Sequence, residues 1–96
     1  MTIHYDPFLY VPNTFTPDDD EFNRNFQAIG GNIQEFEMYI YNRWGELVYT
    51  MLSMEDFWDG TYGGIMAQDG TYVWKAIIMD FNDIRSVHTG HVNLLR

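Results

Sequence analysis

The sequence has no cysteine, few cations and no long apolar run, and each absence excludes a class of protein. Without cysteine there is neither a disulfide framework nor thiol chemistry. Lys and Arg number 5 against 14 Asp and Glu, and the formal charge of -9 disfavours nucleic acid and anionic membrane surfaces as partners. The longest apolar runs are far below the roughly 20 residues of a transmembrane helix, so we expect no direct membrane insertion.

The N-terminus also lacks the features of an export signal. The first residues, MTIHYDPF, contain neither a basic segment nor an apolar one, so a signal for export would have to belong to a longer parent protein. The 96 residues suffice for one domain with one core, and we expect a monomer. Residues 1–6 are expected to be a linker remnant or the frayed start of the first strand.

Aromatic residues are abundant, at 18% of the chain, and they favour pleated, half-buried surfaces. Residues 35–41 alternate between apolar and polar with a period of two, which predicts a half-buried strand. The NRWG segment at residues 42–45 then predicts a hairpin turn before a second strand over residues 46–52. Further alternation predicts a long strand over residues 71–81 and a final strand over residues 86–96.

Two other segments complete the predicted fold. Residues 8–15 read as a strand interrupted by Pro12, and residues 53–70 as a long connection with one short strand near residues 65–67. No segment shows a helical period. Short strands separated by regular turn signals predict an all-β fold, an antiparallel immunoglobulin-like β-sandwich of about seven strands.

Residues that could support catalysis are scarce. Ser53 and Ser86 stand in no recognisable nucleophile motif and next to no candidate base. His88 and His91 could suggest a metal site, but their odd separation on a strand turns the two rings to opposite faces. The sequence therefore predicts that the protein is not an enzyme.

An acidic run after NTFTP is the strongest candidate for a metal site. Asp18, Asp20 and Asn23 could supply oxygen ligands to calcium. The run lacks the Gly and Glu of an EF-hand loop at the expected positions, and Arg24 places a positive charge among the ligands. Calcium binding is therefore the alternative to a solvated loop without metal, and no other cofactor is expected.

The three tryptophans could form a sugar-binding surface. Trp74 lies in an alternating strand, whereas Trp44 and Trp58 flank glycines in turns, where an indole can cover the end of a core. Packing is therefore the favoured interpretation of all three. The alternative function is an adhesive or carbohydrate-binding immunoglobulin-like module that uses Trp44, Trp58 and the acidic run, with or without calcium.

Several motifs occur in a fixed order: YVPNTFTPDDDEFN, YIYNRWGELVY, WDGTYGG, DGTYVWK and TGHVNLLR. Together, over about residues 10 to 96, they resemble the gliding motility-associated C-terminal domain, the type B sorting domain of the Bacteroidetes type IX secretion system. The resemblance implies a non-catalytic signal that directs a larger parent protein through the periplasm and across the outer membrane to the cell surface or medium. In that family the acidic run usually reads Asn-Gly-Asp-Gly, a variable residue, then Asn-Asp, so this chain departs from it at Asp19, Glu21 and Arg24.

The resemblance also implies a partner, an outer-membrane shuttle or accessory protein of the type IX system. We expect the final strand, residues 86–96, together with the adjoining sheet edge, to present the recognition surface, because a strand at a sheet edge has unpaired backbone groups that a partner can match by strand addition. Removing residues 94–96 is expected to abolish export without unfolding the domain. The candidate recognition residues are Gly90, His91, Val92, Leu94, Leu95 and Arg96. The turn motifs, which either hold the fold or touch the receptor, are Asn42, Arg43, Trp44 and Gly45, and Trp58, Asp59 and Gly60.

Overall fold

The computed structural model describes residues 6–17 and 25–95. Regular structure in this part of the chain is β-strand, and it contains no helix that could cross a membrane. The strands are β1 (Phe8–Tyr10), β2 (Thr14–Phe15), β3 (Ile29–Gly31), β4 (Ile33–Tyr41), β5 (Leu47–Met51), β6 (Thr61–Tyr62), β7 (Ile65–Met66), β8 (Gly70–Asp80) and β9 (Arg85–Leu94).

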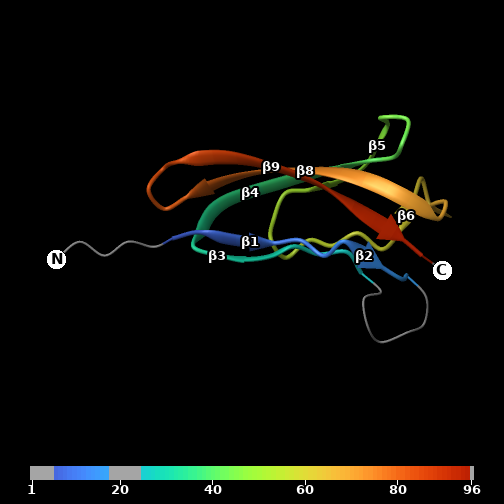
Figure 1. The fold of residues 1–96 in the computed structure, drawn as a ribbon, viewed down its shortest axis with the longest axis horizontal. Coiled ribbons are helices and arrows are strands. Elements are labelled where there is room, and N and C mark those ends of the chain that lie inside the picture. Colours follow the sequence, from blue (N-terminus) through green and yellow to red (C-terminus); the bar gives the residue numbers. More distant parts are fainter. Residues whose placement is uncertain (1–5, 18–24, 96) are drawn as a thin grey trace.

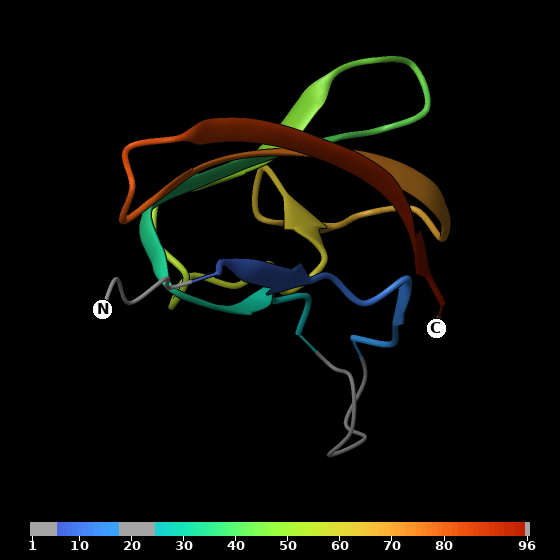
Figure 2. The same ribbon diagram turned by 60° about the vertical axis from the view of Figure 1, so that its left-hand side comes forward.

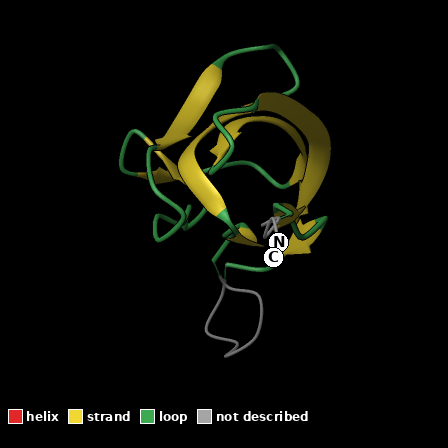
Figure 3. Ribbon diagram, turned by 90° about the vertical axis from the view of Figure 1, so that its left-hand side faces the viewer, coloured by secondary structure: helices red, strands yellow, loops and turns green. Residues whose placement is uncertain are grey.

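The strands form two facing layers. A five-stranded sheet with the order β2-β9-β8-β4-β5 makes one layer, and the short β1-β3 sheet lies across from it (Figure 1). The large sheet curves over β1 and β3, and the view along the molecule shows it curling around the interior (Figures 2 and 3). A separate β6-β7 hairpin lies near one end. The predicted all-β sandwich is confirmed.

Two details differ from the prediction. The described residues form nine strands where the sequence predicted about seven, because residues 8–15 split at Pro12 and because β3 and β6 were not predicted. One pairing is also parallel: Thr14 lies opposite Asn93, and Phe15 opposite Leu94. Pro12 has no N–H for a ladder, and around it the chain leaves β3 and joins β9 in the other layer.

The alternation in the long strands places their apolar side chains in the core. Met38 and Ile40 of β4 lie opposite Ala76 and Trp74 of β8, and all four are buried. Intervening residues such as Lys75 are exposed on the outer face of the sheet. Burial of the side chains in β4 and β8 therefore follows the predicted period of two.

An aromatic cluster fills one end of the core. Phe15 and Trp58 have ring centroids 5.3 Å apart, and the Trp58 and Tyr72 rings meet edge to face at 5.0 Å. Phe26 packs on Phe15 and exchanges two backbone hydrogen bonds with Trp58, at 2.8 and 2.9 Å. Through these contacts the segments around Phe26 and Trp58, which lie outside the strands, pack against β2 and β8.

Candidate functional site

The NRWG turn between β4 and β5 depends on its first and last residues. The Asn42 side-chain oxygen accepts hydrogen bonds from the N–H groups of Trp44 and Glu46, both at 3.0 Å. Gly45 has φ 83°, which glycine adopts without strain, and its N–H donates to the Asn42 carbonyl at 3.0 Å. Asn42 and Gly45 are therefore explained by the turn alone.

The two middle residues of this turn are free to make other contacts. The Trp44 side chain is 63% exposed, and the Arg43 guanidinium lies 4.3 Å from the centroid of its ring. A cation stacked in this way steadies an exposed indole but contributes little to a fold. Arg43 and Trp44 are thus the surface residues of the motif.

The second turn motif is structural throughout. Trp58 is 0% exposed, and its indole N–H donates to the Thr61 carbonyl at 2.8 Å. The Asp59 carboxylate accepts from the backbone N–H and the hydroxyl of Thr61, at 3.1 and 2.7 Å, and Gly60 has φ 85°. The buried Trp58 cannot stack on a sugar, so the surface suggested for a carbohydrate-binding module loses one of its two tryptophans.

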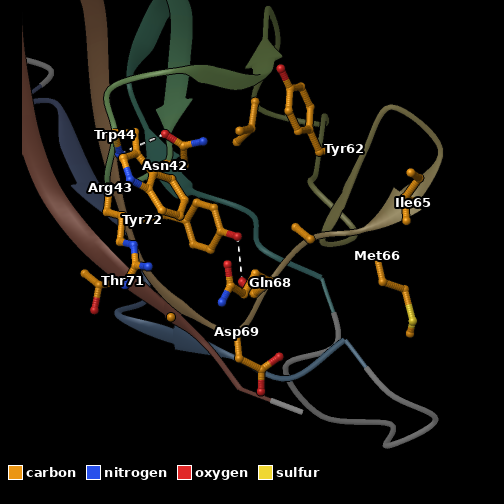
Figure 4. Close-up of a pocket in the computed structure, with 13 residues that line it drawn as sticks. Asn42, Arg43, Trp44, Tyr62, Ile65, Met66, Gln68, Asp69, Thr71 and Tyr72 are labelled. Carbon is orange, nitrogen blue, oxygen red and sulfur yellow. Dashed lines mark hydrogen bonds between the residues drawn. The ribbon is translucent and has the colours of Figure 1, made fainter.

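A cavity of about 520 Å³ opens between the β4-β5 turn and the β6-β7 hairpin. Figure 4 shows Trp44 beside Tyr72 on one side and Tyr62 on the other, with Ile65 and Met66 on the rim. The only charged side chains among its lining residues in the described structure are Arg43 and Asp69. The lining is suited to apolar contact and carries no pairing of a nucleophile with a base.

Gly90, predicted as a recognition residue, makes room for a core side chain. The Trp74 indole lies over it, and a Cβ at position 90 would be 2.5 Å from Trp74 Cζ2. A glycine within a strand often marks such a close approach. The other inward residues near the end of β9, Val92 and Leu94, are both 0% exposed, so their side chains are not available to a partner.

The remaining recognition candidates lie on the surface or outside the described residues. His91 and Leu95 are exposed, whereas Arg96 falls outside the described part of the chain. His88 lies on the inward-facing side of β9, opposite Ala76, and His91 on the outward side, opposite Val73, so the two rings are on opposite faces as predicted.

The end of β9 is not an open sheet edge. The N–H of Asn93 donates to the Asn13 carbonyl at 2.8 Å, and that of Leu95 to the Phe15 carbonyl at 3.1 Å. β2 therefore covers the last residues, contrary to the expectation that the terminus itself offers unpaired backbone groups. Among the described residues no strand pairs with the outer edge of β9 over residues 85–91. The sequence predicted the final strand as one recognition surface, because the parallel β2 pairing that divides it is not visible in any local pattern.

The metal candidates Asp18, Asp20 and Asn23 lie outside the described residues, so calcium binding stays a prediction. Within residues 6–17 and 25–95, no three His, Asp or Glu side chains come together in a way that could hold a metal ion. The resolved pKa shift in this part of the chain belongs to Tyr39, whose pKa is raised by its hydrogen bond to the Glu37 carboxylate.

The comparison with known families agrees with the order of motifs along the chain. The family model of the CHU_C type IX secretion signal domain matches residues 9–94, which include all nine described strands except the first residue of β1. No curated protein matches the chain. Because the family match spans nearly the whole sequence, the chain belongs to the CHU_C family of type IX secretion signal domains.

Proposed function

We propose that this domain is read in its folded form by an outer-membrane shuttle or accessory protein of the type IX secretion system. Membership of the family makes the domain a secretion signal for export across the outer membrane. The proposal adds the kind of partner and the part of the surface that the partner contacts.

The observation that carries the proposal is the exposed first half of β9. Most residues of the family motifs are used by the fold itself, in turns or in the core. The outward-facing residues in the first half of β9 are all exposed: Arg85, Val87, Thr89 and His91. A partner that reads the folded domain has these side chains within reach.

We also propose that the domain catalyses no reaction and that the parent protein travels through the periplasm to the cell surface or medium. The large cavity supports the first point, because its lining is mostly apolar and offers no nucleophile beside a base. The family role supports the second.

An export assay tests the proposal. Residues 1–96 are fused to the C-terminus of a fluorescent protein that carries a Sec signal, and the fusion is expressed in a gliding bacterium. We expect fluorescence at the cell surface or in the medium, and its loss in a mutant without the type IX system. A fusion that stays in the periplasm while a native type IX substrate is exported would contradict the sorting role.

The truncation suggested by the sequence is not a clean test of the contact surface. Removing residues 94–96 deletes Leu94, a fully buried core residue, and would disturb the fold. Leu95→Ser keeps the backbone N–H that bonds to Phe15 and removes only a 51% exposed side chain. Reduced export at an unchanged melting temperature would place Leu95 in the recognition surface, whereas unchanged export would leave the Leu95 side chain outside it.

A further inference from the structure

We propose that the outer edge of β9 along residues 85–91, called here the open edge, binds an extended acidic segment of a partner protein as an added β-strand. This inference rests on the proposed function and specifies the chemistry of the contact. Four features of the described residues support it: the direction of the backbone groups, the shape of the strand, the distribution of charge and an unpaired indole N–H.

The backbone direction follows from the hydrogen bonds at the end of β9. Asn93 and Leu95 point their N–H groups toward β2, away from β8. Alternate residues of a strand point their N–H and C=O groups to the same side. The backbone groups of Arg85, Val87, Thr89 and His91 therefore point the same way, and within residues 6–17 and 25–95 no strand pairs with them there.

The open edge also lacks the features by which proteins usually protect an edge strand. β5, at the opposite edge of the sheet, is five residues long and its pairing with β4 is interrupted by an irregularity after Ile40. β9 is ten residues long, contains no proline and keeps an unbroken register with β8. A long, regular and uncovered edge is a template for strand addition.

The open edge lacks the acidic side chains that predominate in the rest of the protein, and the nearest acids in the sequence are Asp80 and Asp83, before the start of β9. The chain carries 14 acidic residues, yet residues 84–96 contain none, and neither do residues 70–79 of the neighbouring β8. The same segments carry Lys75, Arg85, His88 and His91 in their described part. A strand with acidic side chains therefore meets a complementary surface here, and a basic strand does not.

Trp74 adds a hydrogen-bond donor beside this edge. Its indole is buried, and its N–H has no acceptor among the described residues. The ring lies across Gly90, with Nε1 3.0 Å from the position that a Cβ there would take. A carboxylate on the inward face of an added strand near Gly90 would give this N–H the acceptor that buried donors normally have.

A second copy of the chain is a poorer occupant. Antiparallel pairing of two open edges would bring the Arg85 of one copy close to the His91 of the other, in two chains that each carry a formal charge of -9. The occupant that fits is an acidic segment of another protein.

The first test removes one backbone donor from each edge of the sheet in the exported fluorescent fusion. Thr89→Pro deletes an N–H of the open edge without touching a bond to β8. Thr50→Pro is the matched control: Thr50 lies opposite Tyr39, whose backbone groups face β8, so its N–H points outward from β5. Export of the Thr89→Pro fusion should fall about tenfold, whereas Thr50→Pro should be exported as the parent fusion is.

The outcomes separate the two proposals. If the parent fusion is exported and Thr89→Pro is exported equally well, the open-edge proposal fails and the sorting role stands. If the parent fusion itself is not exported, the sorting role fails. Circular dichroism melting of both proline variants is measured beside the assay, and a Thr89→Val variant, which keeps the N–H, should be exported normally. Loss of export with Thr89→Val would assign the effect to the side chain and overturn the strand-addition geometry.

A second test uses the isolated 96-residue chain and needs no export. A short peptide of alternating Thr and Glu is titrated into the labelled protein and compared with a peptide of alternating Thr and Lys. The Glu peptide should shift the amide resonances of residues 85, 87, 89 and 91, and its affinity should fall severalfold in Trp74→Phe, which keeps a ring but has no N–H. Equal binding of both peptides, or a concentration-dependent dimer that Thr89→Pro dissociates, would overturn the acidic partner.

Discussion

The two halves of β9 lie in one strand and pair with the same neighbour, yet they differ in burial. On the inward face, Val92 and Leu94 are fully buried, whereas Ser86 is only half-buried and His88 is exposed. At the outer edge, the second half is paired with β2, whereas no strand in residues 6–17 and 25–95 pairs with the first half. The second half thus holds the sandwich together and the first half leaves backbone and side chains accessible.

The difference begins at Pro12. β1 pairs with β3 in one layer, and after Pro12 the chain passes to the other layer, where β2 pairs with Asn93 and Leu94 and accepts a hydrogen bond from Leu95. Because β2 has only two residues, its pairing with β9 ends well before the start of β9. A short crossing strand at the end of the sheet therefore divides β9 into a structural part and an accessible part.

The largest expected effect comes from truncating one apolar side chain in each half. Leu94→Ala should lower the free energy of unfolding by about 2–5 kcal/mol, because it leaves a cavity in a fully packed core. Val87→Ala, at a 55% exposed position, should change it by no more than about 0.5 kcal/mol. Urea unfolding followed by tryptophan fluorescence measures both, and similar losses would contradict the division of β9.

A smaller effect is expected at Gly90, where the two halves meet. Gly90→Ala should lower the free energy of unfolding by about 1–3 kcal/mol, because the new Cβ forces the Trp74 indole to move. Ser86→Ala, on the same face of the first half, is the control and should have little effect. In a Trp74→Ala background the cost of Gly90→Ala should largely disappear, and a cost that persists in this double-mutant cycle would point to the backbone instead of the indole.

The long strands could be predicted because their burial follows a local pattern. In β4 and β8 every second residue faces the core, so alternation in the sequence identified both strands to within a few residues of their ends. The turn at residues 42–45 was equally local, since the hydrogen bonds that form it join Asn42 to Trp44, Gly45 and Glu46. Fold class and strand positions therefore needed no knowledge of distant contacts.

The environment of the candidate recognition residues depends on contacts between residues that are distant in the sequence, and local patterns do not contain these contacts. Gly90 was predicted to touch a partner. Its contact with Trp74 could not be predicted, because it depends on the register of β9 against β8. A glycine inside a strand was the available signal for that close approach. The cover that β2 places over Asn93 and Leu94 had no signal beyond Pro12, so the sequence predicted the final strand as one surface and did not separate its covered end from its first half.

The smallest effect concerns the outer face of the sheet, where Tyr39, Lys75 and Thr89 lie side by side on β4, β8 and β9. The Tyr39 hydroxyl donates to the Glu37 carboxylate, and this bond raises the pKa of Tyr39 above the ordinary value of 10.0. Because the folded protein holds this proton more tightly than the unfolded chain, the stabilisation is present below pH 10.0 and is lost as the pH rises through the folded pKa.

Glu37→Gln should return the pKa of Tyr39 toward its ordinary value, and a residue-specific NMR titration of the tyrosine ring measures it. Leu94→Ala is the control where the fold survives, because the second half of β9 contains no titratable side chain within residues 92–95. If Tyr39 responds to Glu37→Gln and not to Leu94→Ala, the exposed face titrates independently of the core. Equal responses would mean that the outer face of β4 is coupled to the core at the end of β9 through the sheet.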